Sequence, residues 1–433
     1  MTFLNVDQAN FYNYVINNQD SNGIILLNAP AGTGKSYTIK QVIKKLYRYH
    51  VLAPTNKACS ILSNDIRGVM TIHKFLNSRH NVDDNGFISF KFNENLNYRN
   101  NVIIVDECSM INNDMFNIFL KLSEKNMIIF VGDDLQLPPI NNDCDDSKKY
   151  NISTKSMCFT CENERTFNFT KNMRSRLLAS TLMLENARKS CYSETMPTKL
   201  NSLPIDNIIS IFKENLETDK SVVILSYTNA SVNNYNNIIR SSIFNESIEN
   251  LQKYYIGEKL IFSGCCVKND IKYVTSDEII IKDLDIIELK IDFVRCDCKD
   301  NEYKRTKCKK HDFRKDFIIL KFYRIVDQNK SEWLKPVNDK QFYILQSQYK
   351  KLCTIKKQSS IWKKYYEFID EFNADLKYNY AMTVHKSQGS QFNIVFVDRS
   401  NIISCCSQDL LLKINCYYTA ISRMIEEVYD IEK

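Results

Sequence analysis

The stretch that most constrains this chain is residues 24–40, IILLNAPAGTGKSYTIK. Four apolar residues, Ile24 to Leu27, have the pattern of a buried parallel strand, and a helix-like amphipathic pattern follows after a loop of small residues. The loop, residues 29–36, reads GxxxxGK[ST] with alanine at the first position. A chance glycine turn is the alternative, but a strand before the loop and a helix after it are the setting in which this loop cradles phosphates.

The residue types of the loop fit phosphate chemistry. Gly32 and Gly34 let backbone N–H groups curl around phosphate oxygens, and the next helix points its positive end at them. Lys35 supplies a point charge for the outer phosphates, and the Ser36 hydroxyl is a Mg²⁺ ligand. The loop therefore predicts binding of a nucleoside triphosphate with Mg²⁺.

Two further segments predict hydrolysis of that nucleotide. Asp106 and Glu107 follow the apolar run VIIV, as an Mg²⁺-holding aspartate and a water-activating glutamate do in ATPases. The alternative is a solvated carboxylate pair at a strand end. The phosphate loop about 70 residues earlier favours the ATPase interpretation over it. In GDDLQLPP (132–139), Gln136 is a candidate sensor of the γ-phosphate, and the prolines fix the loop that leaves it.

Length and composition bound the class of protein. A chain of 433 residues with 44% hydrophobic and 25% charged residues is expected to form two or three globular domains. No apolar run approaches the roughly 18 residues of a membrane span, so no membrane partner is expected. The net charge of +7 permits a polyanionic partner. Fifteen cysteines without a secretory pattern predict a reducing intracellular compartment, cytoplasm or nucleus, rather than a disulfide framework.

The order of the segments predicts an α/β fold. Strands and helices alternate up to about residue 165, and the polar motifs stand just past the ends of apolar strands, where doubly wound sheets bind ligands. A second α/β unit is indicated by SVVILSY (221–227) and NIVFVD (393–398). Residues 77–100 and the lysine-rich stretch 250–375 interrupt the alternation and are interpreted as insertions.

The ordered motifs resemble those of superfamily 1 helicases of the RecD/Dda-like 1B branch, single-chain helicases of the viral or phage kind. The resemblance covers the chain outside the two insertions. It is carried by Gln8, APAGTGKS, APTNKA, TIHKFL, VDECSM, GDDLQLPP, FTKNMRS, TNASVN, TVHKSQGSQF and YYTAISR. Three positions depart from the family pattern, namely Ala29 for glycine, Cys108 for a smaller residue and Gln391 for a glutamate facing the ribose.

The resemblance implies two RecA-like P-loop NTPase domains with small insertions. Domain 1A would span residues 1–165, with hairpin 1B at 77–100, and domain 2A would comprise 166–249 and 376–433, with the mostly β, basic domain 2B at 250–375. ATP would lie between 1A and 2A. Gln8 would read the adenine, and Gln391 would face the ribose. The other implied ATP-site residues are Ala29, Gly32, Thr33, Gly34, Lys35, Ser36, Asp106, Glu107 and Gln136 from 1A, with Arg174 and Arg423 from 2A.

The resemblance also implies a path for a nucleic-acid strand. Its residues would be Thr55, Asn56, Thr71 and His73 in the first domain and Thr383, His385 and Ser387 in the second. Most are short donors that suit phosphates rather than base edges, so sequence-independent binding is implied.

The predicted activity is an ATP- and Mg²⁺-dependent helicase that moves 5′→3′ on single-stranded DNA and unwinds forked duplex. The alternatives are a DNA-stimulated ATPase that translocates or remodels complexes without separating strands, and a non-catalytic DNA-binding assembly subunit. The chain is expected to be monomeric or weakly associating, with replication or repair proteins as further partners.

Three features of the insertions leave two interpretations each. Phe87, Phe90 and Phe92 of a hairpin at 86–92 would stack on bases at a duplex-splitting wedge, or only pack the hairpin. Lys340 to Tyr366 holds seven lysines and no acid, predicting an amphipathic helix whose basic face is solvated or contacts nucleic acid. Cys296, Cys298, Cys308 and His311 have near-ligand spacing for Zn²⁺, with chance clustering of cysteines as the alternative.

Overall fold

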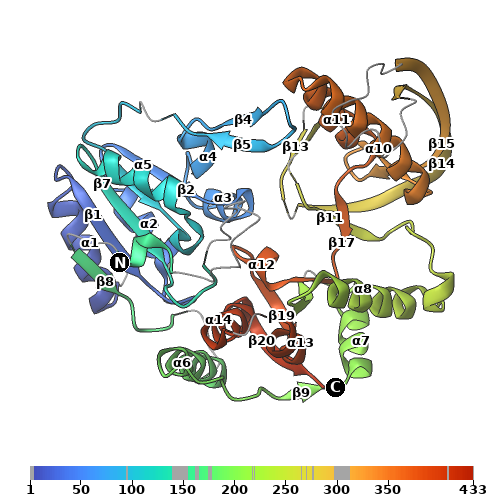
Figure 1. Cartoon of the computed structure of the whole chain (residues 1–433). Helices are drawn as coiled ribbons and strands as arrows, with labels where there is room; N and C mark the ends of the chain where they lie inside the picture. The colour runs from blue at the N-terminus through green and yellow to red at the C-terminus, as the bar shows by residue number, and fades with distance from the viewer. Residues whose placement is uncertain are drawn as a thin grey trace. The chain divides into compact units, whose positions relative to one another are not determined.

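The computed structural model divides the chain into two compact units (Figure 1). The first comprises Met1–Leu76, Glu94–Leu251 and Asn379–Lys433, and the second comprises Asn77–Asn93 and Gln252–Tyr378. The structure describes residues 4–93, 96–138, 155–160, 165–173, 178–216, 218, 220–264, 266–269, 271–275, 277–296, 313–406 and 409–432. Among these residues no helix has both the length and the apolar character needed to cross a bilayer.

The first unit holds two parallel sheets. The larger sheet has the order β3-β2-β6-β7-β1-β8, and every pairing in it is parallel. Its strands are β1 (Gly23–Asn28), β2 (Tyr49–Ala53), β3 (Met70–Thr71), β6 (Val102–Val105), β7 (Met127–Gly132) and β8 (Arg165–Asn168). The short apolar runs of β1, β6 and β7 are buried, as expected of strands covered on both faces.

Helices pack on both faces of this sheet. Residues of α1 (Val6–Asn17), α2 (Lys35–Ile43) and α3 (Asn56–Ser63) share one apolar core with alternate residues of the strands. On the opposite face α5 (Asn113–Ser123) places Phe116 and Phe119 5.8 Å, ring centre to ring centre, from Phe130 of β7. The short helix α4 (Ile72–Phe75) follows β3, and the 3₁₀ turns η1 (Cys108–Met110) and η2 (Met157–Phe159) complete this part.

The second sheet of the unit has the order β18-β10-β19-β20-β9, again parallel throughout. Its strands are β9 (Ser202–Leu203), β10 (Val222–Ser226), β18 (Ala381–Thr383), β19 (Phe392–Val397) and β20 (Met424–Ile431). The helices of this part are α6 (Leu178–Tyr192), α7 (Ile205–Glu214), α8 (Asn229–Phe244), α12 (Val384–Ser387), α13 (Arg399–Cys405) and α14 (Leu410–Ile421), with a 3₁₀ turn η3 (Ile248–Asn250). Two parallel sheets with covering helices are the predicted pair of RecA-like folds.

The second unit is built on an antiparallel sheet with the order β16-β15-β14-β11-β17. Its long ribbon is β14 (Glu278–Cys296) and β15 (Phe313–Asp327), flanked by β11 (Lys259–Phe262), β16 (Glu332–Pro336) and β17 (Leu376–Tyr378), with a small hairpin of β12 (Cys266–Lys268) and β13 (Ile271–Tyr273). Helix α10 (Asp339–Lys356) buries Phe342 and Leu345 against the ribbon, and α11 (Ser359–Phe372) follows.

A hairpin that lies in the chain between strands β3 and β6 of the first sheet belongs to this second unit. It consists of β4 (Arg79–Val82) and β5 (Ile88–Lys91), at the predicted place. Val82 shares a small core with Cys353 and Trp362 of the two helices. Two segments far apart in sequence thus form one body.

The structure confirms the α/β class with two RecA-like folds and small insertions, and it refines three details. The predicted end of domain 1A at residue 165 falls inside β8, which pairs with β1 and extends the first sheet to Asn168. The predicted return to domain 2A at residue 376 coincides with β17, which belongs to the inserted sheet. A single helix predicted from Lys340 onward is wrong, because the left-handed backbone of Lys357 (φ 47°) ends α10 and a second helix begins at Ser359.

The zinc hypothesis falls largely outside the described residues. Cys298, Cys308 and His311 are not among them, and Cys296 is described only as the last backbone position of β14. Of the hairpin phenylalanines, the Phe90 side chain is likewise not described, whereas Phe87 is exposed and Phe92 is half-buried.

Candidate active site

The phosphate loop connects β1 to α2 with two left-handed glycines. Gly32 and Gly34 have φ values of 83° and 85°, and residues other than glycine adopt such backbone angles only with strain. A Cβ atom on Gly34 would also lie 2.6 Å from the Gln8 amide nitrogen. Ala29, where the family pattern has glycine, keeps an ordinary backbone and is fully buried, so the substitution is accommodated. Lys35 donates to the Ala29 carbonyl at 2.8 Å and begins helix α2.

Gln8 joins helix α1 to the phosphate loop. Its amide oxygen accepts from the Asn5 N–H at 3.0 Å, completing a capping box at the start of α1. Its amide nitrogen donates to the Thr33 carbonyl at 3.0 Å. Gln8 is therefore held rigidly beside the loop, while Thr33 is buried and bonds to the Pro30 carbonyl at 2.8 Å.

The acidic pair follows β6. Burial raises the pKa of Asp106 to about 6, and the neighbouring Glu107 carboxylate acts in the same direction, whereas Lys35 lowers it. Glu107 has a left-handed backbone with φ 51°, a strained conformation of the kind that often positions a functional side chain. One Glu107 carboxylate oxygen is buried without a partner among the described residues. Such an oxygen can accept a hydrogen bond from a ligand or a water molecule.

Cys108 has a packing role beside this pair. The side chain is fully buried, and burial raises the pKa of the thiol well above its ordinary value. A Cβ atom on Gly132, at the end of β7, would lie 2.6 Å from its sulfur. Cys108 and Gly132 therefore fit each other by size, and the buried thiol acts as a small hydrophobic side chain.

Gln136 lies in a loop that both folds hold. It is almost fully buried, and its amide oxygen has no partner in the described part of the chain. The next residue, Leu137, receives two bonds from the second fold, because its N–H donates to Thr419 Oγ1 at 3.0 Å and its carbonyl accepts from Gln388 at 3.1 Å. The position of Gln136 therefore depends on both folds.

Arg423 reaches the site from the turn after α14. Its guanidinium donates to the Ser422 hydroxyl at 2.9 Å and to the Thr419 carbonyl at 3.2 Å, and only 3% of the residue is exposed. The second predicted arginine, Arg174, lies outside the described residues.

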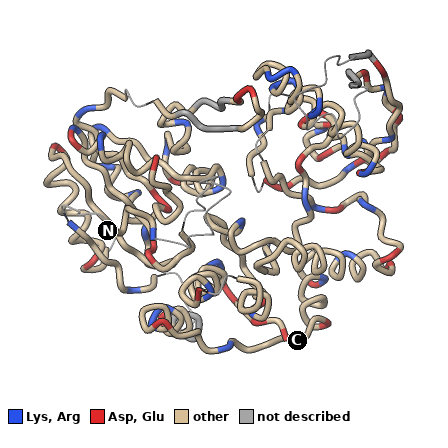
Figure 2. The backbone as a smooth tube through the Cα atoms, in the orientation of Figure 1, with Lys and Arg blue, Asp and Glu red and all other residues tan. Residues whose placement is uncertain are grey.

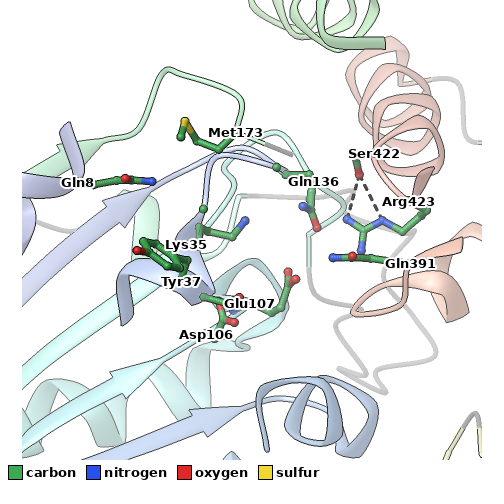
Figure 3. A pocket seen from close by; sticks show the side chains of 14 residues that line it. Gln8, Lys35, Tyr37, Asp106, Glu107, Gln136, Met173, Gln391, Ser422 and Arg423 are labelled. Atoms are coloured by element: carbon green, nitrogen blue, oxygen red, sulfur yellow. Dashed lines mark hydrogen bonds between the residues drawn. The ribbon is translucent and has the colours of Figure 1, made fainter. Parts of the chain in front are cut away.

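These side chains line a pocket of about 450 Å³ within the first unit (Figure 3). Figure 3 shows the ends of Glu107, Gln136 and Arg423 facing the same space. The lining residues predicted from sequence are Gln8, Gly32, Gly34, Lys35, Ser36, Asp106, Glu107, Gln136, Gln391 and Arg423. The sequence did not predict Ala31, Tyr37, Met173 and Ser422 as lining residues. Three of them stand inside motifs quoted above, and Tyr37 directly follows one. A lysine, a hydroxyl, two carboxylates and the start of a helix in one pocket fit a nucleoside triphosphate with Mg²⁺.

The residues predicted to meet a strand lie at the starts of short helices. Thr55, Thr71 and Thr383 are the N-caps of α3, α4 and α12, and their hydroxyls accept from backbone N–H groups at 3.1, 3.2 and 3.4 Å. Asn56 and His73 belong to α3 and α4. In α12, burial lowers the pKa of His385, and the fully buried Ser387 donates to the Val384 carbonyl at 2.7 Å.

The two groups of predicted strand residues approach each other. Gly389, just after α12, has φ 76°, and a Cβ atom there would lie 3.3 Å from the Thr55 hydroxyl. The first fold and the second fold thus meet where the two sets of helix starts lie.

A buried ionic cluster that sequence reasoning missed also links the folds. Arg188 of α6 donates to Asp133 at 2.7 Å and to Asp134 at 3.2 Å, and the Tyr418 hydroxyl of α14 donates to Asp133 at 2.7 Å. Asp133 is fully buried, so these bonds compensate for the loss of its hydration. Both aspartates stand in the quoted GDDLQLPP motif, but nothing local in the sequence identifies Arg188 as their partner.

Comparison with known proteins agrees with this arrangement. Residues 13–142 match the model of an AAA domain, and residues 378–429 match the UvrD-like helicase C-terminal domain. An uncharacterized protein of Acanthamoeba polyphaga mimivirus, R530, is 25% identical over 95% of this chain and 96% of its own length. The RecBCD enzyme subunit RecD of Buchnera aphidicola subsp. Schizaphis graminum is also 25% identical, over 93% of this chain and 69% of its own.

Solved structures show the same fold. Pif1 helicase from Bacteroides, in complex with ADP-AlF3 and ssDNA, superposes with a TM-score of 0.51 at 15% identity, covering 99% of this chain and 92% of that one. Pif1 helicase from Candida albicans gives a TM-score of 0.51 at 14% identity, covering 100% and 95%. The two RecA-like folds and their shared nucleotide pocket define an ATP-driven DNA helicase. Within that class, the chain is similar to superfamily 1B helicases of the RecD/Pif1-like type.

Proposed function

We propose that this helicase moves 5′→3′ along single-stranded DNA and separates the strands of a forked duplex, using ATP with Mg²⁺. The observation that carries the proposal is the pocket of about 450 Å³ in which groups from both RecA-like folds converge. Closure of two such folds on ATP and their release after hydrolysis would alternate the grip on a strand. The 5′→3′ direction rests on the resemblance to the 1B branch alone.

The roles of the pocket residues follow from their chemistry. Lys35 neutralises the outer phosphates, and Ser36 and Asp106 hold Mg²⁺, which would disperse the charge that develops on the phosphates. To bind them, Lys35 exchanges its bond to the Ala29 carbonyl for a phosphate oxygen. Gln391 lines the pocket and presents an amide for the ribose.

Hydrolysis needs an oriented water, and two buried acceptors in the pocket suit that task. The unpartnered oxygens of Glu107 and Gln136 would accept hydrogen bonds from the two O–H groups of one water molecule. Glu107 then takes a proton as the water attacks the γ-phosphate. Arg423 and Arg174 would stabilise the charge on the transferred phosphoryl group.

A DNA strand is proposed to cross the junction between the folds. Thr55, Asn56, Thr71 and His73 would contact it from the first fold, with Thr383 and His385 from the second. The contact between Gly389 and Thr55 supports a continuous path. Since the Ser387 hydroxyl is buried and bonded to Val384, we assign Ser387 the support of α12 rather than direct contact.

The setting is proposed to be intracellular. The nine cysteines whose side chains are described form no disulfide, as expected in a reducing compartment. We further propose a chain that works as a monomer or weak oligomer on single-stranded and forked DNA, together with replication or repair proteins.

One pair of assays tests the proposal. Strand separation is measured on a forked duplex, and ATPase activity is measured with bare single-stranded DNA. A helicase is active in both assays, whereas a translocase without strand separation is active only in the second. A non-catalytic assembly subunit would be inactive in both.

A further inference from the structure

The second unit contains a basic turn next to the loop of the inserted hairpin. The turn joins α10 to α11, and its five exposed lysines are Lys350, Lys356, Lys357, Lys363 and Lys364. Figure 2 shows the basic residues along these two helices. We term these five lysines the lysine turn.

Hydrogen bonds fix the hairpin loop on this turn. The Ser359 N–H donates to the Asp84 carboxylate at 3.1 Å, and the Trp362 indole donates to the Asp84 carbonyl at 3.2 Å. The Tyr366 hydroxyl donates to the Gly86 carbonyl at 2.8 Å. Only 2% of Trp362 is exposed, and a Cβ atom on Gly86 would lie 2.5 Å from its ring. The close fit makes the loop and the lysine turn one rigid surface.

The acids of the hairpin loop are already engaged by backbone groups. Asp83 accepts from the N–H groups of Asn85 and Phe87 at 2.9 and 2.8 Å, and Asp84 caps the start of α11. Within the described part of the chain, Lys350, Lys357, Lys363 and Lys364 take part in no ion pair. The turn therefore keeps an excess of positive charge that its own fold does not neutralise.

Helix stability explains only part of this charge. Lys356 lies in the last turn of α10, where a cation interacts favourably with the helix dipole. Lys363 and Lys364 lie in the N-terminal half of α11, where the dipole offers cations no stabilisation. An external polyanion would account for these two lysines.

The hairpin loop that rests on the lysine turn also carries an exposed aromatic ring. Phe87 directly follows Gly86, which the Tyr366 hydroxyl holds, and 68% of Phe87 is exposed. Lysines that contact phosphates, next to a ring that can cover a terminal base pair, match the end of a nucleic-acid duplex.

We infer that the lysine turn binds the phosphate backbone of duplex DNA at a junction with single strands, beside the hairpin that the family resemblance implies as a wedge at the end of that duplex. The inference rests on the proposed function, since it names a second substrate contact for the same enzyme. It differs from the strand path in the first unit, because it concerns duplex rather than single-stranded DNA.

A charge-removing variant tests the inference. In K350Q/K363Q/K364Q, three phosphate contacts are lost, while a matched control, K44Q/K45Q/K125Q, removes three exposed lysines of the first unit. Affinity is measured by fluorescence anisotropy on a forked duplex and on its single-stranded arm, over a range of salt. The fork affinity of the test variant should fall about tenfold, and the salt slope by about 2–3, at roughly 0.9 per lost contact.

Three further measurements separate a duplex contact from a general loss of DNA binding or folding. Single-strand affinity and ATPase activity stimulated by single-stranded DNA should be unchanged, and K350R/K363R/K364R should bind forks normally. Unchanged fork affinity, or an equal loss on fork and single strand, would overturn the inference, as would an equal effect of the control variant. Failure of the wild-type ATPase to respond to DNA would instead refute the proposed function.

Discussion

The hydroxyl of Tyr418 donates a 2.7 Å hydrogen bond to the fully buried carboxylate of Asp133. Tyr418 lies in α14 of the second RecA-like fold, and Asp133 begins the loop that carries Gln136 in the first. Burial, together with the Asp133 charge, raises the pKa of Tyr418 well above its ordinary value, so the phenol keeps its proton. The helix that ends just before Arg423 is thereby tied to the loop of the proposed γ-phosphate sensor.

Removing this bond should weaken the contact between the folds. Tyr418→Phe deletes the hydrogen bond to a buried charge, which corresponds to about 1.5–3 kcal/mol of stability, together with a longer bond accepted from Arg188 at 3.3 Å. We expect a melting temperature several degrees lower by scanning calorimetry. Tyr429→Phe is the matched control, because the Tyr429 hydroxyl bonds to Glu427 at 2.8 Å in an exposed position. Equal melting temperatures for the two variants would show that the buried bond adds no stability.

Substitutions of Lys35 and of Glu107 should impair ATP hydrolysis for different reasons. Lys35→Ala is expected to weaken nucleotide binding together with turnover, since it removes the charge that faces the outer phosphates. Glu107→Gln should retain ATP binding and lower kcat by about 10²-fold or more, because the amide cannot take a proton. Equilibrium binding of a fluorescent nucleotide, beside steady-state ATPase kinetics, separates the two effects. Near-normal DNA-stimulated turnover in Glu107→Gln would disprove the assignment of the base.

Arg423 should matter for turnover and not for DNA affinity. Arg423→Ala removes a guanidinium that is 3% exposed and lines the nucleotide pocket, so kcat should fall on the order of 10³-fold. Arg174→Ala is predicted to behave in the same way. Single-strand binding, measured without nucleotide, should equal that of the wild type. Reduced DNA affinity with an intact ATPase would place these arginines on the strand path instead.

Much of the nucleotide pocket could be predicted because its chemistry is local in the sequence. The phosphate loop, the acidic pair and Gln136 each follow directly on a short apolar strand, and parallel strands bring their carboxyl ends together. The strand-like alternation at 86–92 and the helical character of 340–366 were also predicted from periodicity, although the break at Lys357 was not.

Contacts between distant segments could not be predicted in this way. Tyr418 and Asp133 are 285 positions apart, and Trp362 and Asp84 are 278 apart, so no periodic pattern pairs them. The end of α10 depends on a left-handed lysine, a residue type that carries no signal for such a turn. The Gln8 bond to the Thr33 carbonyl, 25 positions away, likewise depends on the placement of α1 against the phosphate loop.

The central claim is that ATP hydrolysis in the shared pocket drives 5′→3′ strand separation. Its most direct test is unwinding, under single-turnover conditions with ATP and Mg²⁺, of two duplexes that differ only in having a 5′ or a 3′ single-stranded tail. The account predicts that the wild-type protein separates the 5′-tailed duplex and leaves the 3′-tailed duplex intact, and that Glu107→Gln separates neither. Separation of the 3′-tailed duplex, or of neither duplex by a protein whose ATPase responds to single-stranded DNA, would contradict it.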